Sequence, residues 1–299
     1  SFPTRRSSDL IRKKERLLES QLNQNNNDFY SSKKVIHIDK EHVRKMLFSK
    51  LNVKIYDSQA LKSVVKELKK ELKEGFLCQN DVIDKTISHS SLLFSDTFNP
   101  NKPISFVFRG NIGLGKRTFA DLLGKIMFNN NIIKIDLMEY SNPYAINVLI
   151  NNNDVDNNFL KVLRNNSQSI IVFDNIDNCD FRLYPILSQI VIKGFIDDVN
   201  GSKINFLNSL IVFISDSRTS SNLGFINDSL TDSLDLNKNV TKVIDFKDLN
   251  LDNIKSIIKA KTNNSLNDAE ITDIIKKLRV ENKGLKDINQ IINAYFNKD

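Results

Sequence analysis

The sequence contains little that could build a metal centre, a disulfide framework or a membrane anchor. It has two cysteines, Cys78 and Cys179, and three histidines, and neither set has the spacing of a disulfide framework or a zinc site. No apolar run approaches the roughly 18 residues that predict a membrane span, and no signal peptide is visible. These absences predict a soluble, cytoplasmic protein without a membrane partner.

The composition does not favour a nucleic-acid partner either. The net charge is +7, but the basic residues are mostly lysines scattered along amphipathic helices. Lysine, asparagine and isoleucine are abundant and all have A/T-rich codons, so a biased genome explains much of the charge. Tryptophan is absent, and the 19 phenylalanines are better explained as core residues than as a surface for stacking bases.

Four segments are expected along the chain. Residues 1–9 are interpreted as a non-native leader, and residues 10–34 as a helical or disordered linker. Residues 35–248 are predicted to form a large α/β domain. Residues 249–299 are predicted to form a small all-helical domain, because isoleucine and leucine recur there at helical spacing.

The first part of the large domain shows a short strand pattern at 35–38 and helical spacing at 40–51. A second helix is predicted from a cap at Asp57 to near Gly75. The polar segment 78–102 is interpreted as an irregular insertion before the core of the domain.

A glycine-rich loop follows this insertion. The apolar run at 104–108 predicts a buried strand, and 118–128 has apolar residues at helical spacing. Between them, 110–117 follows the phosphate-binding pattern G-x-x-x-x-G-K-[ST], except that Arg117 replaces the hydroxyl residue that holds Mg²⁺. The loop amides are expected to converge on a phosphate at the helix N-terminus, with Lys116 on the terminal phosphates. The alternative is a glycine-rich turn without a ligand.

Four more short apolar runs predict the remaining strands of the large domain. They lie at 132–137, 169–174, 209–215 and 241–246. Such runs, separated by helical or loop sequence, are typical of a parallel sheet covered on both faces. The fold class is therefore predicted as α/β, with a five-stranded parallel sheet and a ligand at the carboxyl ends of the strands.

The strand at 169–174 ends in Asp174, the acid expected on the metal side of the loop. The next residue is Asn175, where a glutamate is expected in this class of nucleotide site. Asparagine can orient a water molecule but cannot take its proton. The sequence therefore predicts a nucleotide fold with uncertain chemistry.

Several stretches resemble the second ATPase module of the Clp-type AAA+ unfoldases and disaggregases. They are 102–108, 133–140, 193–206 and 207–216, within a resemblance that runs from about residue 35 to 286. The resemblance implies an AAA+ P-loop domain followed by a small helical lid, with ATP or ADP as ligand and Mg²⁺ left open. It also implies a homo- or hetero-oligomeric ring that acts on a protein substrate or with partner AAA+ subunits.

The resemblance implies the positions of the site residues. Two residues are expected to flank the adenine and nine to form the phosphate-binding loop: Ile55, Tyr56, Gly110, Asn111, Ile112, Gly113, Leu114, Gly115, Lys116, Arg117 and Thr118. Asp174 is the expected Mg²⁺ ligand, if the metal binds. The four catalytic positions depart from the family pattern: Asn175 replaces the Walker B glutamate, Asp216 the first-sensor asparagine, Asn239 the arginine finger and Lys286 the second-sensor arginine.

The segment aligned with the pore loop that grips the substrate, 151–158, has neither an aromatic residue nor a glycine. The leading hypothesis is a degenerate Clp-like module that binds nucleotide but hydrolyses it poorly or not at all. One alternative is an active, divergent ATPase in which Thr118 or an ordered water replaces the missing hydroxyl. The other is an interaction scaffold that does not depend on nucleotide.

Overall fold

The computed structural model describes most of the chain between residues 39 and 293. The described ranges are 39–51, 54–98, 100–141, 168–197, 203–216, 236–280, 288 and 292–293, with the backbone alone for 48–51 and 278–280. The predictions for 1–38, the pore-loop segment 151–158 and Lys286 lie outside these ranges. The chain divides into two compact units, Ser1–Met46 and Leu47–Asp299. The domain boundary predicted at 248 remains a prediction.

Helix α2 (Lys40–Leu51) confirms the helix predicted for 40–51. In the first unit, the structure describes residues 39–46, which include the start of this helix. Oδ1 of Asp39 accepts a hydrogen bond from the backbone N–H of His42 at 2.8 Å. This bond satisfies one of the amides that a first helical turn leaves without a partner. The hydrogen bonds from His42 lower the pKa of Asp39.

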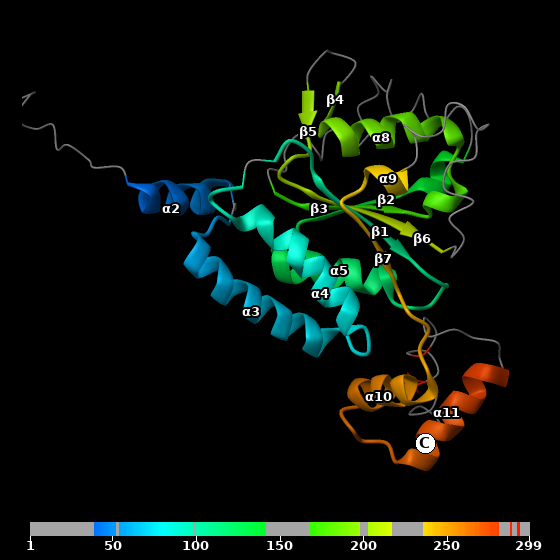
Figure 1. Ribbon diagram of the computed structural model, residues 1–299. Coiled ribbons are helices and arrows are strands. Elements are labelled where there is room, and N and C mark those ends of the chain that lie inside the picture. The colour runs from blue at the N-terminus through cyan, green and yellow to red at the C-terminus, as the bar shows by residue number, and fades with distance from the viewer. Residues whose placement is uncertain are drawn as a thin grey trace, which may run out of the picture. The chain divides into compact units, whose positions relative to one another are not determined.

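The second unit is built on a five-stranded parallel sheet with strand order β2-β3-β6-β1-β7 (Figure 1). Its strands are β1 (Ile104–Arg109), β2 (Ile132–Asp136), β3 (Ile170–Asp174), β6 (Leu210–Ser215) and β7 (Lys242–Asp245). All five were expected from their apolar runs. The predicted α/β class with a five-stranded parallel sheet is thus confirmed.

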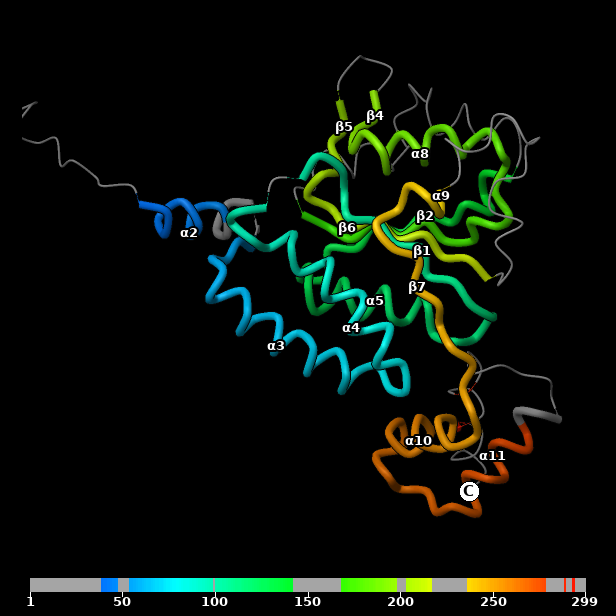
Figure 2. Tube along the Cα trace, in the orientation of Figure 1, coloured from blue at the N-terminus to red at the C-terminus, as the bar shows by residue number. Residues whose placement is uncertain are grey.

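Helices cover both faces of this sheet, as the tube in Figure 2 shows most clearly. The helices α3 (Ser58–Gly75), α4 (Asn80–Ser90) and α5 (Lys116–Met127) lie on one face, and α8 (Tyr184–Lys193) and α9 (Leu236–Asn239) on the other. Successive strand residues supply the two cores in alternation, because side chains along a strand point to opposite faces. Phe106 and Phe108 of β1 belong to the first core, and Val107 between them to the second.

The remaining elements are short or lie towards the C-terminus. Strands β4 (Phe195–Asp197) and β5 (Lys203–Asn205) form the antiparallel hairpin expected from the family resemblance. The 3₁₀ turns are η1 (Ser91–Phe94), η2 (Leu137–Tyr140), η3 (Ile176–Asn178) and η4 (Phe181–Leu183). Helices α10 (Leu251–Lys261) and α11 (Asp268–Val280) share a separate isoleucine-rich core with Ile288 and Ile292. Among the described helices, none has the length and apolar character needed to cross a membrane.

The interpretation of 78–102 as an irregular insertion is wrong, because this segment contains α4 and η1. The buried face of α4 includes Thr86 and Ser90 beside its isoleucine and valine residues. Thr86 Oγ1 donates to the carbonyl of Val82 (2.7 Å), and Ser90 Oγ donates to the carbonyl of Thr86 (2.9 Å). Because the hydroxyls bond within the helix, polar residues can occupy its core-facing side.

Candidate functional site

The glycine-rich loop joins β1 to α5 at the carboxyl end of the sheet. Gly113 and Gly115 have φ angles of 89° and 85°, in the left-handed region that favours glycine. A Cβ on Gly115 would lie 2.9 Å from the ring of Phe76, so the loop and the end of α3 meet too closely for a side chain. The loop therefore has the tight backbone that brings amides to a helix N-terminus.

Lys116 is held inside the loop rather than extended from it. Its side chain is 2% exposed, and Nζ donates to the carbonyls of Gly110 (2.6 Å) and Asn111 (2.7 Å). Nζ also forms an ion pair with Oδ1 of Asp216 at 2.7 Å. The ammonium group is thus satisfied by three oxygen atoms of the protein itself.

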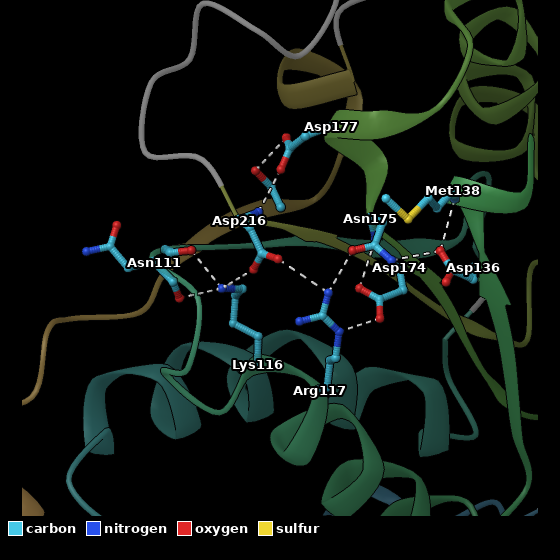
Figure 3. A network of polar contacts seen from close by, with 11 residues as sticks. Asn111, Lys116, Arg117, Asp136, Met138, Asp174, Asn175, Asp177 and Asp216 are labelled. Carbon is cyan, nitrogen blue, oxygen red and sulfur yellow. Dashed lines mark hydrogen bonds and ion pairs between the residues drawn. The ribbon is translucent and has the colours of Figure 1, made fainter. Parts of the chain in front are cut away.

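Arg117 joins the residues that the sequence singled out at the ends of two different strands (Figure 3). Its Nε donates to Oδ2 of Asp174, and its Nη2 donates to Oδ1 of Asn175 (2.8 Å) and Oδ2 of Asp216 (3.3 Å). These acceptors meet because β3 and β6 are neighbouring parallel strands whose carboxyl ends share one edge. Partial burial opposes the charge of Arg117, but the hydrogen bond to Asp174 and the nearby carboxylates outweigh it and raise the pKa of the guanidinium.

Asn175 follows β3 in the left-handed conformation, with φ 57° and ψ 40°. Its Nδ2 donates to Oδ1 of Asp136 (2.7 Å), while its Oδ1 accepts from Arg117. Both ends of the amide are therefore engaged with protein groups. Asn175 is held by these contacts and has no group that could accept a proton from water.

Asp177 fixes the backbone at the end of β6. Its carboxylate accepts hydrogen bonds from the N–H of Asp216 (2.7 Å) and from Oγ of Ser215 (2.9 Å). These bonds aim the Asp216 carboxylate at Lys116 and Arg117. Sequence analysis did not identify Asp177, although it lies only three residues after Asp174, in η3.

A cleft of about 470 Å³ opens beside the loop. Its lining comes from the end of α3 and the residues after it, the loop, and the C-terminal helices: Glu74, Gly75, Phe76, Leu77, Gln79, Ile112, Gly113, Leu114, Gly115, Lys116, Arg117, Thr118, Leu249, Ile257, Ala260, Lys261 and Ile288. The volume and the mixture of apolar walls with loop amides suit a nucleotide-sized ligand. Thr118 lines this cleft as an exposed residue.

Ile55 and Tyr56, expected to flank the adenine, are not among the residues that line this cleft, and their role remains a prediction. Tyr56 forms a parallel bridge with Ser95 and lines a separate hollow between α3 and η1. Phe76 and Leu77 lie in the wall of the cleft. They lie about 20 residues further along the chain, beyond a helix that the sequence pattern also predicted.

Gln79 is a second residue that sequence analysis missed. It is 4% exposed, and its side-chain amide exchanges two hydrogen bonds with the backbone of Lys247, at 2.7 Å and 3.3 Å. The preceding Cys78 has a φ of 66°. These contacts join the start of α4 to the segment after β7, which forms part of the cleft wall.

The other two catalytic positions predicted from the sequence are Asn239 and Lys286. Asn239 ends α9 and is not part of the cleft lining. Lys286 and the turn at 284–286 are among the residues that the structure does not describe. The roles of both residues remain predictions.

Comparison with known proteins assigns the arrangement of sheet, loop and strand-end acids to a family. A family model for the AAA domain (Cdc48 subfamily) matches residues 101–274, more than half of the chain. The chain belongs to this AAA family. Among curated proteins, the ATP-dependent Clp protease ATP-binding subunit ClpL of Staphylococcus aureus strain MRSA252 is 25% identical over 292 residues, covering 89% of this chain and 39% of ClpL. ClpL of strain USA300 is 27% identical over 214 residues, which cover 64% of this chain and 29% of ClpL.

Among solved structures, Hsp104 in its closed state with ATPγS and FITC casein is similar to this protein, with a TM-score of 0.62 and 18% sequence identity. The matched region covers 79% of this chain and 47% of the Hsp104 chain, and the match supports the fold assignment. The prediction of a Clp-type AAA+ module is thus confirmed. The chain spans less than half the length of each of these relatives.

Proposed function

We propose that this chain is a Clp-type AAA+ module that binds ATP or ADP at the loop 110–118 and hydrolyses it very slowly or not at all. The observation that carries the proposal is the position of the Arg117 guanidinium. It lies between Asp174, Asn175 and Asp216, at the strand ends where an active site needs a metal ion and an attacking water. Binding is supported by the loop backbone, Lys116 and the adjoining cleft.

Slow hydrolysis follows from several losses that act on one reaction. Asn175 cannot serve as a base for the attacking water, and Asp216 places a carboxylate beside Lys116. No arginine occurs between Arg218 and Arg279, so this stretch of the chain offers no arginine finger. Such an arginine is worth about 10³–10⁵ in rate in related phosphoryl-transfer systems. Each deficit lowers the rate of the same reaction.

The wider role is proposed from the relatives. ClpL is named as an ATP-binding subunit of an ATP-dependent Clp protease, and Hsp104 was solved with casein, a protein. This chain would act as a regulatory or structural subunit of a homo- or hetero-oligomeric AAA+ ring that remodels proteins. A cytoplasmic location is part of the same proposal. Native mass measured with and without ATP tests ring assembly, and a monomer in both conditions counts against it.

The catalytic part is tested by steady-state phosphate release from the purified chain. The expected rate is lower by about 10³ or more than that of an active Clp ATPase. Lys116→Ala should change this residual rate little, because there is little turnover to remove. A rate comparable with active Clp ATPases that Lys116→Ala abolishes would overturn the proposal in favour of a divergent, working enzyme.

The binding part needs a separate measurement on the same sample. Titration with a fluorescent ADP analogue should show binding that Lys116→Ala weakens, because the ammonium group no longer reaches the phosphates. Lys125→Ala is the matched control: it changes the same residue type on an exposed position of the same helix, α5. Undetectable binding would instead support a scaffold that does not use nucleotide, and equal binding by wild type and Lys116→Ala would contradict the role given to Lys116.

A further inference from the structure

We propose that the Arg117 guanidinium takes the place of the metal ion at this site, so that nucleotide binds without Mg²⁺. The inference rests on the proposed nucleotide-binding function and specifies which form of nucleotide the site accepts. It concerns binding alone and needs no catalytic step.

Mg²⁺, the usual ion of this family, does not fit the residues present. The ion requires nearly octahedral coordination by oxygen ligands, commonly a carboxylate with water and phosphate oxygens. At this site the Asp174 carboxylate accepts from Nε of Arg117, and position 117 has no hydroxyl to offer.

Lys116 and Arg117 are already matched by carboxylates within their direct ion pairs. Lys116 and Arg117 supply two positive charges, and Asp174 and Asp216 supply two negative charges in direct contact with them. A divalent cation at Asp174 would have to displace Arg117 or lie beside its guanidinium, where like charges repel. Because Arg117 is covalently part of α5, it stays at the site at any metal concentration.

The guanidinium also retains the capacity to bind phosphate. Nε and Nη2 donate the hydrogen bonds to Asp174, Asn175 and Asp216, whereas Nη1 donates none to the described residues and points to the side on which Lys116 lies (Figure 3). The planar guanidinium suits phosphate oxygens, and its hydrogen bonds to an ionised acceptor are about twice as strong as neutral ones. Arg117 can thus neutralise phosphate charge from the position that the metal usually occupies.

Titration of the wild-type chain with the fluorescent ADP analogue, in excess MgCl₂ and in excess EDTA, tests the inference without any substitution. We expect the two dissociation constants to agree within about twofold, since no interaction depends on the metal. A wild-type affinity that falls by about tenfold or more in EDTA would overturn the inference and leave the proposed function intact. Absence of binding in both media would overturn the proposed function itself.

Arg117→Thr supplies the positive comparison, since it removes the cation and restores the hydroxyl of the loop pattern. We expect this variant to bind about tenfold more tightly in MgCl₂ than in EDTA, because the metal then supplies the charge-assisted interaction with phosphate. Arg117→Gln removes the cation without adding the hydroxyl ligand and should bind weakly in both media. Arg182→Thr is the matched control, because Arg182 pairs locally with Asp180 and should retain wild-type behaviour. Equal insensitivity of Arg117→Thr and wild type to EDTA, with both bound, would show that Arg117 is not the reason and overturn the assignment.

Discussion

Asp216→Asn is expected to tighten nucleotide binding by about tenfold. This factor corresponds to one additional charge-assisted hydrogen bond between the protein and the phosphate. In the structure, the Asp216 carboxylate holds Lys116 at 2.7 Å and also contacts Arg117, so it competes with phosphate for both cations. Asparagine has the same shape but no charge. The measurement is the same fluorescent titration, carried out with ADP and ATP analogues.

The control for this substitution is Asp245→Asn, which removes an exposed carboxylate at the end of β7. Asp245 pairs with Arg109 at 2.6 Å and is not part of the network of Lys116 and Arg117. The nucleotide affinity of Asp245→Asn should stay within about twofold of wild type, since exposed ion pairs contribute little free energy. An unchanged or weaker affinity of Asp216→Asn would show that the carboxylate does not compete with the ligand.

Phe119→Ala is expected to lower the free energy of unfolding by about 3–5 kcal/mol, the usual cost of removing a buried aromatic ring. Phe119 is fully buried at the start of α5, two residues after Arg117. Its ring centroid lies 4.8 Å from that of Phe76, 5.6 Å from that of Phe108 and 6.0 Å from that of Phe246. The ring therefore joins the loop helix to β1, to the end of β7 and to the cleft wall.

Urea denaturation measures this loss. Phe181→Ala is the matched control, because Phe181 is 53% exposed and its removal should change the unfolding free energy by about 0.5 kcal/mol or less. If Phe119→Ala does not fold, Phe119→Leu provides a milder variant with an expected loss of about 1–3 kcal/mol. A loss below about 1 kcal/mol for Phe119→Ala would contradict this packing of the ring.

The sheet could be predicted from sequence because its strands are short, continuous apolar runs. β1, β3 and β6 are buried on both faces, so their composition leaves few alternatives. α4 could not be recognised in the same way, because threonine and serine share its buried face. The apolar residues that remain there, such as Val82, Ile83 and Ile87, mark only part of the helical period.

The residues of the candidate site could be predicted from the sequence, but the contacts between them could not. The sequence identified four unusual or functional residues: Arg117, Asp174, Asn175 and Asp216. No local pattern shows that Arg117 contacts Asp174, which is 57 positions away, or Asp216, which is 99 positions away. Their meeting depends on β3 and β6 being adjacent, which the strand order decides. Phe76 was not expected in the cleft wall for a related reason: its position depends on which end of α3 faces the loop.

The charge balance around Arg117 also constrains how this site can change over generations. Threonine at position 117 alone leaves Asp174 and Asp216 with one cation fewer, and asparagine at position 216 alone leaves Lys116 and Arg117 with one carboxylate fewer. Removing one partner of a partly buried ion pair destabilises a protein more than removing both. A change at either position alone therefore passes through a less stable single variant, and the two positions are expected to change together.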